Sequence, residues 1–203
     1  MERRLLQEFQ RQVWLQCLFA ANAYGEIDRM IVDGLPIDVT PMTELADRPR
    51  GDVAVQAMMR AVTVNAPFWG AVQSFLTAAA NISKAFWGQG GKLAKERTDL
   101  RVSLNVSDAS AIKTTLMRNH FDHFDERLDA WWADAPRRRS ADLNLVIEFD
   151  LLAQTNLTPV EVFRNFDLRT RELIFWGQRY SLPVMHAELE RIREPAGLQG
   201  LFG

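Results

Sequence analysis

The segment from Leu116 to Trp132, LMRNHFDHFDERLDAWW, holds the residues best suited to chemistry. It contains two of the three histidines of the chain, His120 and His123, together with two arginines and four acids, set between large apolar residues. An imidazole can exchange a proton near neutral pH, and a guanidinium can hold a phosphate through paired hydrogen bonds. The segment therefore raises three alternatives: a solvated helix face, a metal site or a catalytic surface.

The apolar residues of this segment recur at the spacing of an amphipathic helix. At about 100° per residue, the residues that share one side of this helix, and that we expect to be buried, are Met117, Phe121, Phe124, Leu128, Trp131 and Trp132. Arg118 and His123 flank this stripe, and Asn119 lies on the polar arc between them. His120 falls against the apolar edge and is expected to be structural. His123 faces the polar side, although which of the two histidines is functional stays open.

The two simpler interpretations use the same residues. On a solvated face, Arg118 and Asp122 are spaced to pair across one turn, and such an exposed pair is worth only about 0.3–0.5 kcal/mol. A metal site would use His120, His123 and Glu126, but these spread over about 120° of the helix circumference. That is too wide for one ion without ligands from elsewhere. We therefore predict no metal and no other cofactor, and both the solvated and the catalytic surface remain open.

Composition narrows the class of protein. The chain has 203 residues, 47% of them hydrophobic and 25% charged, and a formal net charge of -2, so no global field recruits nucleic acid. The single cysteine, Cys17, excludes an internal disulfide, fits a reducing compartment and is expected to be buried. The N-terminus lacks the apolar stretch of a signal peptide, and no stretch reaches the roughly 18 apolar residues of a membrane helix. We expect a cytoplasmic protein that does not contact membranes.

Helices are expected to position the segment. Helical spacing of apolar residues predicts helical regions over residues 3–33, 52–87, 107–133 and 140–154. Pro67 either interrupts the second region or stands in the first turn of a new helix that Asn65 caps. Ser107 or Asp108 would cap the third helix, which carries the segment. The sequence GQGGK at residues 88–92 ends the second helix, and its spacing differs from that of a phosphate-binding loop. Residues 92–106 are polar and mixed. Arg137, Arg138 and Arg139, at the end of the third helix, are either a solvated helix end or a contact for an RNA backbone.

The C-terminal part changes character. Aromatic and branched residues on either side of DLRTR predict a small β-hairpin over residues 162–180. A short helix would begin at Pro183 and carry His186 at the surface, and residues 196–203 would form a loose tail. The chain is thus predicted to be mainly α. Residues 1–155 would form an up-and-down bundle of four to five helices, and residues 156–203 a hairpin and helix packed on it.

The hexapeptide RNHFDH, from Arg118 to His123, lies on a long predicted helix in a mainly helical chain. It resembles the signature of the HEPN superfamily, in which an arginine followed by a polar residue precedes a histidine. The sequence FLTAAANISKAFW at residues 75–87, followed by this helix, is also similar to uncharacterised bacterial HEPN-like proteins. The resemblance covers roughly residues 1–155 and implies a helical bundle of the HEPN type.

Many HEPN proteins are metal-independent endoribonucleases whose motifs meet across a two-fold dimer. The resemblance therefore implies a homodimer, RNA as substrate, a role in toxicity or defence, and an antitoxin as a further partner. His123 would exchange the proton, Arg118 would hold the phosphate, and Asn119 would orient a group by hydrogen bonding. The alternative is a HEPN-like helical protein that does not catalyse and works as a binding or regulatory partner. The acids around the motif favour this alternative, because they would repel RNA and would meet at a cost in a dimer.

Overall fold

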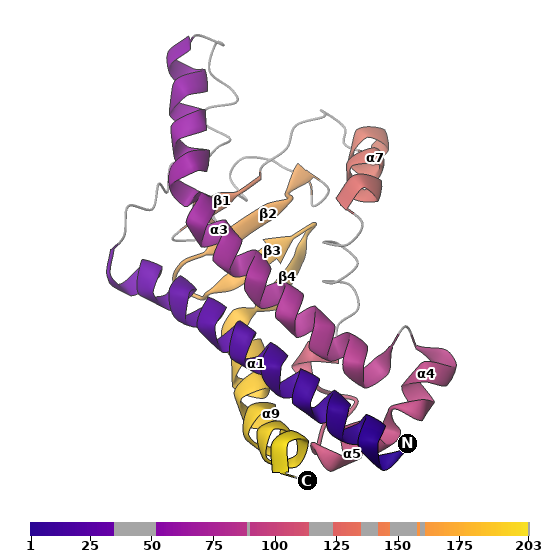
Figure 1. The fold of residues 1–203 in the computed structure, drawn as a ribbon. Helices are drawn as coiled ribbons and strands as arrows, with labels where there is room; N and C mark the ends of the chain where they lie inside the picture. Colours follow the sequence, from indigo (N-terminus) through magenta and orange to yellow (C-terminus); the bar gives the residue numbers. More distant parts are fainter. Residues whose placement is uncertain are drawn as a thin grey trace. The chain divides into compact units, whose positions relative to one another are not determined.

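The protein is described from a computed structural model that defines residues 1–34, 52–88, 90–113, 124–134, 142–146, 158 and 161–202. It is mainly helical, with a four-stranded sheet toward the C-terminus (Figure 1). The described elements are, in chain order, α1 (Arg3–Val32), α3 (Asp52–Trp87), α4 (Gly91–Glu96), α5 (Thr98–Ser103), the 3-10 helix η1 (Ala111–Lys113), α7 (Phe124–Asp134), β1 (Asn144–Val146), β2 (Arg164–Asp167), β3 (Glu172–Phe175), β4 (Gln178–Ser181) and α9 (Leu182–Phe202). Among the described helices, none combines the length and apolar content needed to span a bilayer.

The chain divides into two compact units. The helical unit contains α1 up to Ile27, α3 from Ala71, α4, α5, η1, and α9 from Pro183. The sheet unit contains the end of α1, α3 up to Gly70, α7 and the four strands. Both units take segments from distant parts of the sequence. The predicted division into residues 1–155 and residues 156–203 stays a prediction.

In the helical unit, α1 packs against α3. The rings of Tyr24 and Phe75 lie 5.8 Å apart between centres, and Asn81 donates a hydrogen bond of 3.2 Å to Gln16. The predicted burial of Cys17 is confirmed, since its side chain is 0% exposed, and burial raises the pKa of its thiol to about 12. The predicted extent of α1 agrees with the structure to within one residue, and the second helical region forms one helix that continues through Pro67. Their wide apolar stripes therefore reflect packing inside a helical core.

Close packing of α9 on α1 overturns the predicted loose tail. Helix α9 continues to Phe202, and in Figure 1 it runs beside α1. A Cβ added at Gly197 would lie 2.9 Å from the ring of Trp14, and one added at Gly200 would lie 2.5 Å from the backbone nitrogen of Arg11. The glycines that suggested a tail instead allow the two helices to approach closely.

The prediction that His186 lies at the surface holds only in part, because 27% of its side chain is exposed. Its side chain is half-buried on α9, and its ring stacks on Tyr24 of α1 with a centre distance of 4.0 Å and an angle of 8°. Glu190, one turn further along α9, lies 3.7 Å from the Nε2 atom of His186. The imidazole is therefore part of the contact between α1 and α9.

The sheet unit is built around a four-stranded sheet with the order β1-β2-β3-β4. β1 pairs with β2 in parallel, and the other pairs are antiparallel. Phe175 pairs with Gln178, so Trp176 and Gly177 form a two-residue turn with φ values of 55° and 74°. Two successive positive φ values give the turn whose twist matches that of the strands. The predicted hairpin around DLRTR is confirmed as β2 and β3, although the sheet is larger than predicted.

The first part of α3 covers this sheet (Figure 1). Phe68 meets Phe166 of β2 edge to face, with ring centres 5.0 Å apart, and both side chains are at most 1% exposed. The neighbouring Trp69 donates a hydrogen bond of 3.1 Å from Nε1 to the carbonyl of Leu143. One turn of α3 therefore fixes both the centre of the sheet and the start of β1.

Two predicted helices differ from the structure. Residues 107–113 form turns and η1 rather than the start of a long helix, because Ser107 accepts a local hydrogen bond from the backbone of Ala109. Residues 142–146 enter β1 instead of a fourth helix, and Leu143 adopts a φ of 57° that a helix does not allow. A short apolar stretch fits a buried strand as well as a buried helix. Residues 114–123 and 147–157 lie outside the described residues.

Replacing Gly200 by Ala is expected to lower the free energy of unfolding by about 1–3 kcal/mol, because the added methyl group meets the backbone of α1. Replacing Gly25 by Ala is the matched control, since nothing lies within 4 Å of the added atom. That change should raise the free energy of unfolding by up to about 1 kcal/mol through helix propensity. Urea denaturation followed by circular dichroism measures both. Equal stabilisation by the two changes would contradict the packing of α9 on α1.

Candidate functional site

The residues predicted to act in catalysis, Arg118, Asn119 and His123, lie outside the described residues, as does His120. The structure therefore places none of them, and their roles stay predictions. The part of the segment that is described is α7, which is helical as predicted. The prediction of helix thus holds for residues 124–134.

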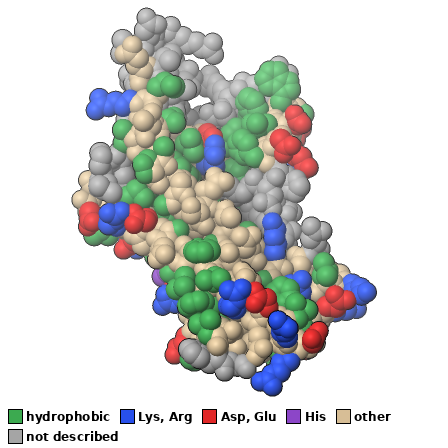
Figure 2. Space-filling model, viewed as in Figure 1, with side chains coloured by type: hydrophobic (Ala, Val, Ile, Leu, Met, Phe, Trp, Pro, Cys, Tyr) green, Lys and Arg blue, Asp and Glu red, His purple; other side chains and the backbone are tan. Residues whose placement is uncertain are grey.

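The packing of α7 is narrower than the predicted buried stripe. Phe124 and Trp131, two turns apart, both meet the ring of Phe163 edge to face, at 6.0 Å and 5.8 Å between centres. Leu128 and Trp132 were expected to be buried, but they are 39% and 55% exposed. Figure 2 shows hydrophobic and acidic side chains together over α7. Phe124 also stacks on Phe175, with ring centres 6.4 Å apart, and its ring centre lies 5.0 Å from the Cζ of Arg164. The aromatic packing of α7 is therefore made by Phe124 and Trp131, while Leu128 and Trp132 stay exposed.

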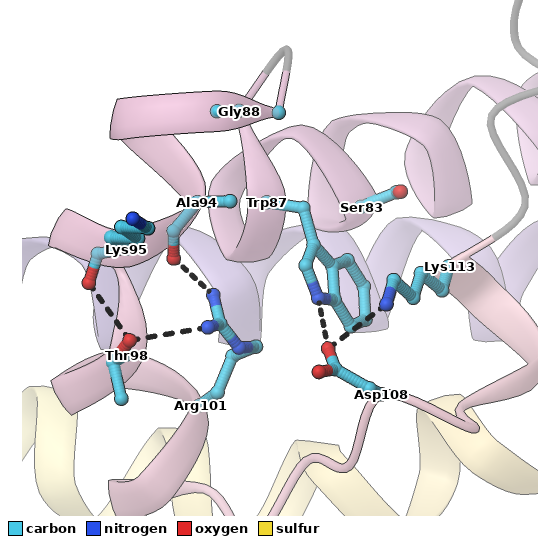
Figure 3. Close-up of a pocket in the computed structure, with 11 residues that line it drawn as sticks. Ser83, Trp87, Gly88, Ala94, Lys95, Thr98, Arg101, Asp108 and Lys113 are labelled. Atoms are coloured by element: carbon cyan, nitrogen blue, oxygen red, sulfur yellow. Dashed lines mark hydrogen bonds and ion pairs between the residues drawn. The ribbon is translucent and has the colours of Figure 1, made fainter.

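A pocket of about 470 Å³ opens in the helical unit (Figure 3). Its walls come from the end of α3, from Gly88, Gly90 and Gly91, and from α4, α5 and the segment that leads to η1. The turn requires glycine, because Gly88 has a φ of 56° and an added Cβ would lie 2.8 Å from the Cβ of Leu93. The second helix therefore ends at GQGGK as predicted, and Gly88, Gly90 and Gly91 of this sequence line the pocket.

Two arginines hold the walls of the pocket together. Arg101 donates from Nη1 to the carbonyls of Phe86 (2.6 Å) and Ala94 (2.7 Å), and from Nη2 to the hydroxyl of Thr98 (3.2 Å). Arg97 donates to the carbonyl of Ala85 at 2.9 Å. The last carbonyls of a helix need partners, and guanidinium groups also favour the negative end of the helix dipole. The end of α3 is thus tied to α4 and α5.

The indole of Trp87 is the centre of the pocket. Its Nε1 donates a hydrogen bond of 3.0 Å to Oδ1 of Asp108, which also receives Lys113 Nζ at 3.0 Å. The Cζ of Arg101 and the Nζ of Lys113 lie 6.0 Å and 5.8 Å from the ring centre, and Figure 3 shows the indole between them. Cations this close to an indole are attracted by its ring electrons. Trp87 is therefore fixed by a hydrogen bond and by two charges.

Electrostatics favours a negative charge in the pocket. The indole hydrogen bond, followed by the hydrogen bond and charge of Lys113, lowers the pKa of Asp108 below its ordinary value. Asp108 is the one acid that lines the pocket, and the cations that line it are Lys95, Arg101 and Lys113. The three cations outnumber the carboxylate among the described lining residues, so the pocket is suited to binding an anion.

Sequence reasoning missed this pocket, because residues 92–106 were interpreted only as polar and mixed. They contain α4 and α5. Arg97 and Arg101, one helical turn apart directly after a glycine turn, were the available signal. Among the described residues, no three His, Cys, Asp or Glu side chains are grouped so that they could hold a metal ion.

Replacing Asp108 by Asn is expected to lower the free energy of unfolding near neutral pH, because Trp87 and Lys113 lose a charged acceptor. The pKa of Asp108 is lower in the folded protein, so its stabilisation is complete above the ordinary aspartate pKa and is lost as the pH falls through the folded value. The difference from the wild type, measured by urea denaturation, should therefore persist down to about pH 5 and shrink as the pH falls further. Asp125→Asn, at an exposed position of α7, is the matched control for the loss of a surface carboxylate. A difference independent of pH would contradict the electrostatic assignment.

The chain matches no family model, no curated protein and no solved structure.

Proposed function

We propose that the chain is a HEPN-like, metal-independent endoribonuclease. It would act as a homodimer, with Arg118, Asn119 and His123 of both copies lining one cleft, in the manner of a toxin or a defence component. Under this proposal the helices form an up-and-down bundle of the HEPN type, and an antitoxin is a further partner. The proposal rests on the sequence motif and on one observation of the structure, the arrangement of α7.

Helix α7 supports the proposal because one side is anchored and the other is open. Phe124, directly after the predicted catalytic histidine, packs on Phe163 together with Trp131. Asp125, Glu126 and Asp129 are exposed, so the polar side of α7 faces solvent. A motif at the start of a helix held in this way would have a rigid support and free access for a substrate.

The proposed reaction is an internal transesterification of RNA. The ribose 2′-oxygen bonds to the adjacent phosphorus, and His123 takes up the proton that this oxygen loses. The bond from phosphorus to the 5′-oxygen breaks, and the leaving oxygen receives a proton from the second copy of His123. Arg118 would bind the phosphate and stabilise its developing charge, and Asn119 would orient it. The products would be a 2′,3′-cyclic phosphate and a 5′-hydroxyl.

A second candidate is a HEPN-like protein without catalysis that binds a partner or regulates it. The exposed acids of α7 favour this candidate, because like charge would repel the phosphates of RNA. The exposed side chains of Trp132 and Leu128, at 55% and 39%, would give a partner an apolar contact. The two candidates differ in one observable, which is RNA cleavage.

The wild-type protein is expected to cleave single-stranded RNA in the presence of EDTA and to leave 2′,3′-cyclic phosphate ends. Arg118→Ala and His123→Ala should each lower the cleavage rate by at least about 100-fold, since each removes a group that acts in the transition state. Arg60→Ala, at an exposed position of α3, is the matched control and should leave the rate unchanged. Denaturing gels and end-group analysis measure rate and product.

The remaining outcomes are informative as well. Absence of cleavage by the wild type and all variants would favour the binding protein. Sensitivity to EDTA would contradict a metal-independent mechanism. In a bacterial host, toxicity of the wild type that His123→Ala removes would support the role as a toxin.

A further inference from the structure

We propose that the pocket at Trp87 is a binding site for a small phosphate ester that carries sugar hydroxyls, such as a ribose phosphate or a mononucleotide. This inference is separate from the proposed nuclease site, because it uses none of Arg118, Asn119 and His123. It rests on the charge of the pocket, on its unused polar groups and on its fixed shape.

Charge selects a phosphate. Lys95, Arg101 and Lys113 line the pocket against the single carboxylate of Asp108, which leaves an excess of two positive charges. A phosphate monoester carries about two negative charges near neutral pH. The Nη1 and Nη2 groups of Arg101 donate hydrogen bonds to protein oxygens. Its Nε–H has no hydrogen-bond partner in the described part of the chain. This N–H is therefore available to a phosphate oxygen, as are the ammonium groups of the two lysines.

Two polar groups of the pocket that lack a protein partner favour a ligand with hydroxyl groups next to its phosphate. Ser83 is only 3% exposed but lines the pocket, and within the described residues its hydroxyl has no hydrogen-bond partner. A buried polar group gains when a ligand supplies its missing partner. Both protein donors to Asp108 use Oδ1, so Oδ2 can accept from a ligand hydroxyl. A sugar offers hydroxyls that can serve both groups.

The size and stiffness of the pocket fit such a ligand. Its volume of about 470 Å³ lies within the roughly 300–1,000 Å³ of small-molecule sites. Trp87 and Ala94 give it an apolar wall against which the carbon side of a sugar can pack. The hydrogen bonds of Arg101 hold α4 and α5 to the end of α3, so little ordering is required on binding.

Isothermal titration calorimetry with inorganic phosphate, ribose 5-phosphate and AMP tests the proposal, with ribose and adenosine as ligands that lack phosphate. The two ribose phosphates should bind more tightly than inorganic phosphate, and the uncharged ligands should not bind. Lys95→Ala should weaken the binding of ribose phosphates by about tenfold, because it removes a charged donor. Lys92→Ala, three residues earlier on α4 with a side chain 89% exposed, is the matched control and should bind like the wild type.

Two further variants separate the parts of the inference. Ser83→Ala should weaken the binding of ribose phosphates while leaving inorganic phosphate unaffected. His123→Ala should bind as the wild type does, so that failure of the nuclease proposal and failure of this one are distinguished. No binding of any phosphate at about 1 mM, or equal losses for Lys92→Ala and Lys95→Ala, would overturn the site. Binding of inorganic phosphate with no gain from ribose would overturn the assignment to a sugar phosphate.

Discussion

The hydrogen bonds at the end of α3 are the constraint on which the helical unit depends. A helix that ends against other helices must find donors for its last carbonyl groups. Arg97 and Arg101 supply them, and the same guanidinium of Arg101 reaches Ala94 and Thr98. The position of α4 and α5 follows from this. A helix end that required capping has thereby become the wall of a pocket.

In the sheet unit, the corresponding constraint is the set of side-chain contacts that hold β1 in place. β1 has three residues and, among the described strands, pairs with β2 alone, so its backbone hydrogen bonds stabilise it little. Its position is fixed from outside, by Trp69, by the ring of Phe68 on Phe166, and by the hydrogen bond of 2.7 Å between Asn144 and Asn165. A short strand is therefore held mainly by side chains.

Elements that are determined by contacts between residues close in sequence could be predicted, whereas those that depend on distant residues could not. The helices α1 and α3 and the β2–β3 hairpin were predictable, because apolar spacing and a polar turn act within a few residues. β1 was not, since its partner lies about twenty residues further on, at Asn165. The end of α9 was predicted as a tail because Gly197 and Gly200 disfavour an isolated helix. In the folded protein the same two glycines allow α9 to pack closely against α1.

The same distinction applies to the two candidate sites. Arg118 and His123 were found from a local motif, and they stay a prediction about residues beyond the described part of the chain. In the pocket, Trp87 forms a hydrogen bond with Asp108, which is 21 residues further along the chain. No local sequence pattern predicts that contact. The prediction that Leu128 and Trp132 are buried was wrong for a related reason. Helix periodicity predicts which side of a helix faces the core, but it does not predict how much of that side the neighbouring elements cover.

The burial of Cys17 has a practical consequence. It is the only cysteine of the chain, its side chain is 0% exposed, and the pKa of its thiol is raised to about 12. A thiol that is both covered and protonated does not react with alkylating reagents. Alkylation of Cys17 therefore requires α1 to separate from the helices packed on it. The rate at which the chain is labelled at this one position then measures the rate at which its helical core opens.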